Sequence, residues 1–210
     1  MAIRVLICED HVMVRQGLRS LLEQAGMEVV AEAGDGREAV RQAGNLRPDV
    51  AVLDVEVPLL NGIEVARTIQ REGWQTRTIV LTMYPERTYL LEALRAGVHG
   101  YLLKTKAADN LVHAVREVAQ GAIHLGPDFS REVLKEILDS AALPEDPLTA
   151  REREVLLLVA EGKTTKEVAS ILGIGAKTAE SHRARIMEKL DIHEAAGLVR
   201  YAVRRGLIRA

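Results

Sequence analysis

The sequence predicts an α/β domain with a five-stranded parallel sheet, followed by a smaller all-α domain of four helices. Three observations predict this architecture. Short apolar segments alternate five times with helical patterns as far as about residue 120. Two prolines and two acids then interrupt the chain at 144–147, and a short helix, a glycine-containing turn and a longer helix follow. Alternating strands and helices with short connections form a parallel sheet that helices cover on both faces.

The predicted strands are continuous apolar runs, which are typical of strands buried on both faces of a parallel sheet. They cover residues 3–8, 28–33, 50–54, 78–82 and 100–103. The predicted helices cover residues 13–25, 36–44, 62–72, 86–96 and 107–120; in the first, Leu18, Leu21, Leu22 and Ala25 repeat at the spacing of one helical face. Five βα units in about 120 residues fit a doubly wound, flavodoxin-like strand order.

The domain boundary is predicted at the break Pro144-Glu145-Asp146-Pro147, because this run cannot continue a helix. Gly121 is the expected C-cap of the fifth helix. A short helix over 129–140 is expected within the linker. We therefore assign 1–122 to the α/β domain, 123–146 to the linker and 147–210 to the all-α domain.

The all-α domain begins with a predicted capping box, in which Thr149 is the N-cap and Glu152 lies three residues later. The first helix has the apolar stripe Val155, Leu156, Val159 and Ala160, and it ends at Gly162. Helices are expected over 165–172, 176–190 and about 194–205, with the turn Gly173-Ile174-Gly175 between the first two of these. A short helix, a glycine turn and a longer helix predict a helix-turn-helix unit.

Composition and charge narrow the function classes. Cys8 is the one cysteine, so no internal disulfide can form, and a reducing, cytoplasmic location is expected. The start of the chain has no export pattern, and no apolar run reaches the ~18 residues of a membrane span. Residues 1–147 carry a net charge of −6 and residues 148–210 a net charge of +4. Nucleic acid is therefore a candidate partner for the second domain.

Polar residues close four of the predicted strands: Glu9 and Asp10, Asp54, Thr82, and Lys104. Sites in parallel sheets form beyond the carboxyl ends of the strands, so we expect these residues in one cleft. Asp10 and Asp54 are expected as direct ligands of Mg²⁺, with Glu9 acting through a water. A carboxylate can attack phosphorus, while the cation and Lys104 neutralise phosphoryl charge and Thr82 donates a hydrogen bond.

Residues 3–120 resemble the receiver (CheY-like) domain of bacterial two-component response regulators. The matching pieces are Cys8-Glu9-Asp10-His11, Val52-Leu53-Asp54, Pro58, Asn61-Gly62, Leu81-Thr82 and Gly100-Tyr101-Leu102-Leu103-Lys104. The resemblance implies that Asp54 accepts phosphate from a sensor histidine kinase, with Mg²⁺ at Glu9, Asp10, Asp54 and the carbonyl of Glu56. It also implies a switch in which Thr82 moves toward the phosphate and Tyr101 turns inward. The simpler alternative for Tyr101 is a partly buried ring at a strand edge.

Two features depart from or vary the receiver pattern. Val57 stands where the family usually has methionine. Glu56 and Tyr84 occupy positions that tune hydrolysis of the acyl phosphate in the family, and the direction of their effect is left open.

The stretch from Leu148 to Leu207 resembles the DNA-binding domain of the NarL/FixJ (LuxR-type) subgroup. The matching residues are Leu148-Thr149-Ala150-Arg151-Glu152, Val155-Leu156, Ala160-Glu161-Gly162, Lys166-Glu167-Val168-Ala169, Leu172-Gly173-Ile174, Lys177-Thr178, His182 and Lys189-Leu190. The recognition helix would be Ala176–Leu190, lying in the major groove of double-stranded promoter DNA. Three residues vary the pattern: Gly175 replaces the usual Ser/Thr N-cap, Ala179 replaces valine, and Glu180 stands where many relatives carry a cation.

The DNA-facing residues follow from this helix. Ala179, Ile186 and Leu190 can pack inward, which leaves Thr178, Glu180, Ser181, Arg183, Ala184 and Arg185 for the DNA side. Arginine can read guanine, and glutamate can accept from cytosine. Phosphate contacts are expected from the residues at helix starts, Lys163, Thr165, Lys166 and Lys177. For His182, a buried side chain that hydrogen-bonds the backbone is favoured over a DNA contact.

These features predict a phosphorylation-dependent transcription factor rather than an enzyme. Phosphorylation of Asp54 is expected to favour a homodimer that binds paired half-sites. The final helix, with Ala195, Leu198, Val199 and Ala202, either contributes to the dimer or closes the small core. Two alternatives remain. A haloacid-dehalogenase-like phosphatase would need an aspartate at the position of Glu56, and a degenerate receiver would work without phosphate.

Overall fold

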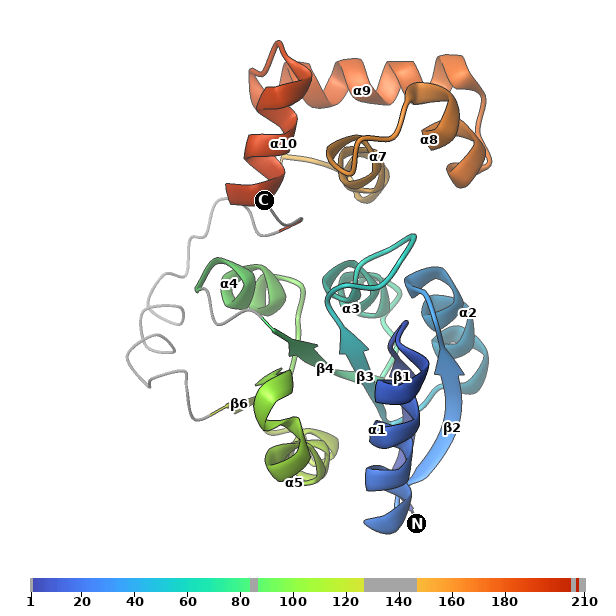
Figure 1. The fold of residues 1–210 in the computed structure, drawn as a ribbon, viewed down its shortest axis with the longest axis vertical. Helices are drawn as coiled ribbons and strands as arrows, with labels where there is room; N and C mark the ends of the chain where they lie inside the picture. Colours follow the sequence, from blue (N-terminus) through green and yellow to red (C-terminus); the bar gives the residue numbers. More distant parts are fainter. Residues whose placement is uncertain (1, 84–86, 127–146, 205–206, 208–210) are drawn as a thin grey trace. The chain divides into compact units, whose positions relative to one another are not determined.

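The computed structural model describes residues 2–83, 87–126, 147–204 and 207 (Figure 1). The chain divides into two compact units, Met1–Leu138 and Asp139–Ala210. The expected linking helix over 129–140, residues 144–146 of the proline break, and Tyr84 lie outside the described residues.

The first unit is a parallel sheet with the strand order β2-β1-β3-β4-β5-β6. The strands are β1 (Arg4–Cys8), β2 (Glu28–Ala33), β3 (Val50–Asp54), β4 (Arg77–Thr82), β5 (Gly100–Leu103) and β6 (His124–Leu125). The helices are α1 (Val12–Gln24), α2 (Gly36–Leu46), α3 (Gly62–Arg71), α4 (Arg87–Arg95) and α5 (Ala107–Ala119), with a short 3₁₀ turn at Lys104–Lys106 before α5. The flavodoxin-like order is confirmed for the five predicted strands.

The prediction of five strands was wrong by one, because residues 124–125 add β6 to the edge of the sheet. His124 pairs with Gly100, and the His124 N–H donates to the carbonyl of His99 at 2.8 Å. The assignment of 123–146 to the linker was therefore also wrong at its beginning. A two-residue strand with one apolar side chain, Leu125, is too short to leave an apolar run in the sequence.

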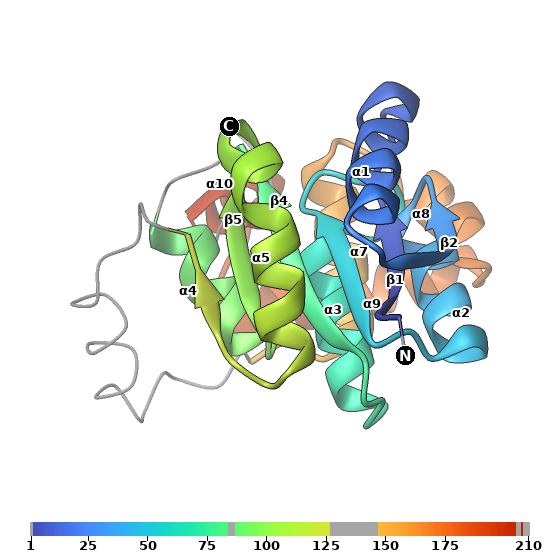
Figure 2. The same cartoon turned by 90° about the horizontal axis from the view of Figure 1, so that it is seen from below.

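Each face of the sheet has its own apolar core. Val5, Ile7 and Leu81 pack on one face with Leu22 of α1 and Leu111 of α5. On the other face, the side chains of Leu6, Leu53 and Val80 pack with α2, α3 and α4. Figure 1 shows α2, α3 and α4 on one side of the sheet, and Figure 2 looks onto α1 and α5 on the other. Every residue of β3 is buried, as its continuous apolar run predicts.

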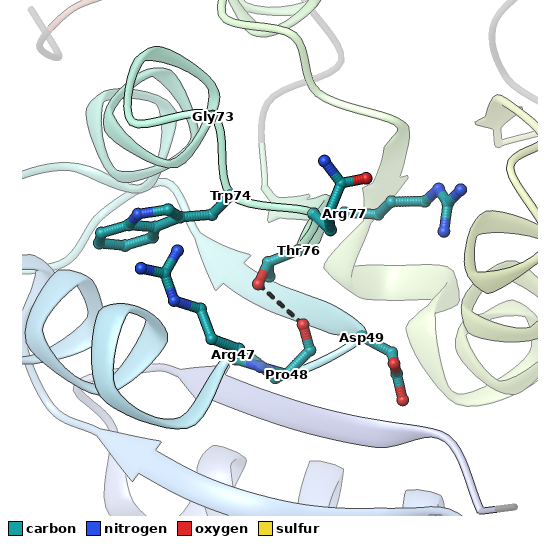
Figure 3. Close-up of a pocket in the computed structure, with 8 residues that line it drawn as sticks. Arg47, Pro48, Asp49, Gly73, Trp74, Thr76 and Arg77 are labelled. Atoms are coloured by element: carbon teal, nitrogen blue, oxygen red, sulfur yellow. Dashed lines mark hydrogen bonds between the residues drawn. The ribbon is translucent and has the colours of Figure 1, made fainter.

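A pocket of about 320 Å³ lies beside the segments that lead into β3 and β4, at the amino ends of these strands. The guanidinium of Arg47 lies 4.4 Å from the centroid of the Trp74 ring, which is a cation–π contact. The Thr76 hydroxyl donates to the carbonyl of Pro48 at 2.7 Å (Figure 3). These contacts join two loops, and they lie at the opposite ends of the strands from the polar residues singled out above.

The second unit consists of α7 (Ala150–Ala160), α8 (Thr165–Leu172), α9 (Ala176–Leu190) and α10 (Ala195–Arg204). Leu156, Ile186 and Leu198 are fully buried and come from three of these helices. Gly162 and Gly173 follow α7 and α8 with positive φ angles of 83° and 64°, which glycine adopts without steric cost. The helix-turn-helix prediction is confirmed at this level.

The predicted capping box at Thr149 and Glu152 is confirmed. Glu152 is only 3% exposed, and its Oε2 lies 2.6 Å from Lys189 Nζ of α9. Burial raises the pKa of Glu152, but hydrogen bonds from Lys189 and Thr149 outweigh burial and hold that pKa at about 2. The ionised carboxylate therefore ties the start of α7 to the last turn of α9.

We expect Glu152→Gln to destabilise the helical unit by about 1–3 kcal/mol at neutral pH. Because the folded pKa is depressed, this contribution is fully present above the unfolded value of about 4.5 and is lost as the pH falls toward about 2. Hydrogen exchange of α7 and α9 amides in the full chain, compared between wild type and variant, measures the difference. Glu154→Gln is the control, since its partly exposed pair with Arg151 should contribute less than about 1 kcal/mol. A difference that did not change with pH would contradict the role of the charge.

Candidate functional site

The strand register brings the predicted polar residues to one edge of the sheet. Cys8 pairs with Leu53, so Glu9 comes just beyond β1 beside Asp54. Asp54 pairs with Leu81, and Thr82 pairs with Leu103, so Lys104 follows directly. The order in which strands are added reverses between β1 and β3, because β2 lies outside β1 and β4 lies outside β3. Ligand crevices in such sheets form at this point.

Lys104 joins two of the acidic groups. Its Nζ lies 2.7 Å from Glu9 Oε2 and 2.8 Å from Asp54 Oδ2. Glu9 is fully buried and Asp54 is 3% exposed, so the Lys104 ammonium attracts both carboxylates with little screening by water. The structure therefore places Glu9, Asp54 and Lys104 together, as expected.

The pKa values of Asp54 and Lys104 follow from this pairing. Burial raises the pKa of Asp54, and the hydrogen bond and charge of Lys104 offset this only in part, so the net shift is upward. Burial lowers the pKa of Lys104, but the hydrogen bonds to Asp54 and Glu9 outweigh burial, so the net shift is upward. Lys104 consequently remains an ammonium beside the carboxylates.

Two residues that contact Glu9, His11 and Arg15, had no predicted role. His11 Nδ1 lies 2.7 Å from Asp10 Oδ1 and 3.1 Å from Glu9 Oε1, and the hydrogen bond to Glu9 raises the pKa of His11. The Arg15 guanidinium donates to the carbonyl of Glu9. The position of His11 directly after two acids was a signal for its contact. The sequence carried no signal for the contact of Arg15, because only the folding of α1 brings its side chain back to the backbone of Glu9.

The oxygen atoms at this edge suit a divalent cation. Glu9 Oε2 and Asp10 Oδ1 are buried and accept no hydrogen bond from the described residues beyond their ion pairs. Carboxylate oxygens are the ligands that Mg²⁺ prefers. Together with the Asp54 carboxylate, the donor set fits Mg²⁺ in the place where the sequence predicts it.

The predicted switch residues Thr82 and Tyr101 are both fully buried, on neighbouring strands β4 and β5. The alternative of a partly buried ring for Tyr101 was wrong, because none of its surface is exposed. Val57 is buried, whereas Glu56 is exposed. The Glu56 backbone N–H is a further hydrogen-bond partner of Asp54 that lowers its pKa.

Gly62 lies directly against the backbone of Asp54. A Cβ atom at Gly62 would lie 2.1 Å from the Asp54 carbonyl oxygen, and the Gly62 N–H donates to the Val55 carbonyl at 3.2 Å. Asn61 caps α3 by accepting from the Glu64 N–H at 2.9 Å. The Asn61-Gly62 pair thus allows α3 to begin in contact with the end of β3 that carries Asp54.

We expect Gly62→Ala to destabilise the α/β unit by about 1–3 kcal/mol, because a backbone atom rather than a flexible side chain must move. Hydrogen exchange of the β3 and α3 amides measures the loss. Gly17→Ala is a matched control: nothing lies within 4 Å of its Cβ position in α1, so the same change should stabilise by up to about 1 kcal/mol. Equal effects of the two substitutions would refute the steric argument.

The predicted DNA-facing residues lie on the surface of the helical unit. Lys177, Thr178, Glu180, Ser181, Ala184 and Arg185 are exposed on α9, and Lys163 and Lys166 are exposed at or before the start of α8. Thr165 and Arg183 are partly buried. The structure therefore leaves most of these side chains accessible to a ligand.

The opposite side of α9 faces the core, as predicted. Ala179 and Ile186 are buried, and Leu190 packs against the same cluster. The His182 ring is partly buried, but its Nδ1 is buried and forms no hydrogen bond within the described part of the chain. The expected backbone bond is thus absent at this nitrogen. Gly175 is the N-cap of α9 and provides no side-chain cap.

The apolar residues of α10 divide between the core and the surface. Leu198 and Ala202 are fully buried in the helical core, whereas Ala195 is exposed and Val199 is partly buried. Closing the core is therefore one role of this helix, and its part in a dimer stays a prediction. Among the described residues, no helix combines the length and the apolar character that a membrane crossing needs.

Two family models match the chain. Residues 5–116 match the response regulator receiver domain, and residues 146–202 match the bacterial regulatory proteins of the luxR family. Together the two matches span both units described above.

Full-length relatives share both parts. The transcriptional regulatory protein LiaR of Bacillus subtilis strain 168 is 40% identical over 209 residues, which cover 98% of this chain and 99% of LiaR. The response regulator protein VraR of Staphylococcus aureus strain NCTC 8325 is 36% identical over 210 residues, which cover both chains completely. The structure of a complex of the two-component response regulator RcsB with DNA is similar with a TM-score of 0.57 and 28% identity, covering 97% of this chain and 99% of RcsB.

Proposed function

This chain belongs to the LuxR-type response regulators, which are DNA-binding transcriptional regulators, and from this premise we propose that phosphorylation of Asp54 controls DNA binding by α9. One observation carries the proposal: the Lys104 ammonium lies within 2.8 Å of both Asp54 and the buried Glu9, at the switch point of the sheet. This is a carboxylate beside a fixed positive charge, at the position where a phosphoryl group would be received.

The phosphodonor is a sensor histidine kinase that carries a phosphohistidine. An Asp54 oxygen attacks phosphorus, the phosphorus–nitrogen bond breaks, and the imidazole leaves with the bonding electron pair and takes up a proton. Lys104 neutralises charge that develops on the phosphoryl oxygens, and the Thr82 hydroxyl donates a hydrogen bond to one of them. Mg²⁺, held by Glu9, Asp10, Asp54 and the carbonyl of Glu56, would withdraw further negative charge from these oxygens.

The acyl phosphate then changes the receiver surface. A new dianion beside buried Thr82 recruits its hydroxyl, and any shift of Thr82 is felt by Tyr101 on the adjacent strand. We propose that this change favours a homodimer in the cytoplasm. Such a dimer presents two α9 helices to half-sites about one helical turn apart in double-stranded promoter DNA.

Base and phosphate contacts divide along the helical unit. Lys163, Thr165, Lys166 and Lys177 lie at or near helix starts and contact phosphates, where they set register and supply salt-dependent affinity. Further along α9, Thr178, Glu180, Ser181, Arg183 and Arg185 read bases. The negative charge of Glu180 disfavours phosphate contact and suits acceptance from cytosine N4.

The test is addition of beryllofluoride and Mg²⁺ to the full chain, followed by light scattering and by DNA binding. We expect the mass in solution to double and the affinity for selected DNA to rise about tenfold or more. No change in mass or affinity would overturn phosphorylation control. A DNA-binding protein with a degenerate receiver would then remain.

A further inference from the structure

A cluster of two histidines and one glutamate lies where α5 meets β6, outside the predicted Mg²⁺ site of Glu9, Asp10 and Asp54, which we call the acidic cleft. Its members are His113 and Glu117 of α5 and His124 of β6. We propose that this His113–Glu117–His124 cluster binds a divalent transition-metal ion of the Zn²⁺ class and thereby links α5 to the edge strand of the sheet.

The chain brings the three side chains together in two ways. His113 and Glu117 are four residues apart on α5, so they share one face of the helix. After α5 the chain reverses at Gly121, whose φ is 96°, and the Ala122 N–H donates to the carbonyl of Glu117 at 3.1 Å. Pairing of His124 with Gly100 then places the second imidazole beside Glu117.

The distances within the cluster are short enough for one ion. Glu117 Oε1 lies 3.2 Å from His113 Nε2, and Glu117 Oε2 lies 2.5 Å from His124 Nδ1. One donor atom from each residue lies within 4.8 Å of the other two. Zn²⁺ binds nitrogen and oxygen donors at about 2.0–2.2 Å, so small side-chain rotations bring all three into contact.

The types of donor select the class of metal. Two imidazoles and one carboxylate form the donor set of many zinc sites with three protein ligands. Mg²⁺ prefers oxygen alone and is suited to the acidic cleft instead. The side chain of His113 is 66% exposed, so water can complete the coordination of an ion here.

His124 is the most buried member of the cluster. Its side chain is 13% exposed, and its Nε2 is buried without a hydrogen-bond partner among the described residues. Burial restricts rotation of the ring, so one donor of the cluster is already held in place beside Glu117.

Metal binding would act on the sheet edge beside the switch. The backbone of β6 pairs with β5, and the Gly126 N–H donates to the Tyr101 carbonyl at 2.9 Å. β6 has only two residues and little apolar burial of its own. An ion shared between α5 and His124 would therefore stabilise the strand that borders Tyr101.

Titration of the untagged full chain with Co²⁺ tests the proposal, after treatment with a chelator and in excess Mg²⁺ to occupy the acidic cleft. We expect one Co²⁺ per chain with visible absorption bands of nitrogen ligation, displacement by Zn²⁺, and a rise in thermal stability on binding. His113→Ala and Glu117→Gln should each weaken binding by about tenfold or more. His193→Ala is the control, because this exposed histidine of the helical unit pairs with Asp191 at 3.4 Å, and its loss should leave binding unchanged.

His113 is exposed, so His113→Ala should fold normally, and its thermal unfolding without metal verifies this. Unchanged Co²⁺ affinity in both His113→Ala and Glu117→Gln would overturn the proposal. Binding that disappears in excess Mg²⁺ would overturn it as well, because the ion would then occupy Glu9, Asp10 and His11. Absence of binding at micromolar metal would leave the cluster as an ion pair only.

Discussion

Replacing Asp54 by asparagine is expected to abolish phosphoryl uptake and every response that depends on it. Asparagine retains the size of the side chain and an oxygen that can accept from Lys104, but the amide is a poor nucleophile toward phosphorus. The substitution also removes a buried carboxylate whose pKa is raised by burial, so stability should change by less than about 1.5 kcal/mol. The loss of function would therefore not arise from unfolding.

Intact mass after incubation with acetyl phosphate and Mg²⁺ measures the effect. We expect one added phosphoryl group in the wild type and none in Asp54→Asn. Asp49→Asn is a matched control, because Asp49 immediately precedes the same strand, is exposed, and accepts from the Arg4 N–H at 2.8 Å. Phosphoryl uptake by Asp54→Asn equal to that of the wild type would place the acceptor elsewhere.

Arg185→Ala is expected to weaken specific DNA binding by about 10- to 100-fold. A bidentate contact from arginine to a base is worth about 1–3 kcal/mol of discrimination. Arg185 is exposed on α9, and the described residues give it no ion pair or hydrogen bond that binding would have to break. Its removal should therefore affect the complex far more than the free protein.

The DNA for this measurement is selected from a random duplex library with the beryllofluoride-activated wild type. Fluorescence anisotropy at one fixed salt concentration then compares selected and unrelated duplexes. Arg200→Ala is the control, because Arg200 is exposed on α10 rather than α9. Equal losses on both duplexes would indicate a phosphate contact. No loss on either would show that this part of α9 does not touch DNA.

The sequence by itself was sufficient to predict most of the helices and strands and the polar residues that close the strands. The runs that become β3 and β5 were predicted with their observed bounds, as were α8 and α9. Each depends on signals within a few residues, such as an apolar run or a glycine turn. Because parallel strands end at a common edge, the polar residues that close these runs also predicted where Glu9, Asp54, Thr82 and Lys104 would meet.

Contacts between distant residues needed the tertiary structure. The strand β6 exists only because β5 offers an unpaired edge, and its two residues carry no periodic signal of their own. The full burial of Tyr101 depends on elements that pack around it from elsewhere in the chain. No local rule brings His124 beside His113 and Glu117.

The difference between what the sequence predicted and what needed the tertiary structure has one physical cause. Apolar periodicity, caps and turns act over a few residues, so the order of residues determined the two domains, most of their elements and the chemistry placed at the strand ends. Pair distances, burial and the resulting pKa shifts depend on which surfaces meet after the chain has folded. Only the tertiary structure could therefore show that Lys104 joins Glu9 to Asp54, that Gly62 touches the Asp54 carbonyl, and that α5 and β6 share a cluster of potential metal ligands.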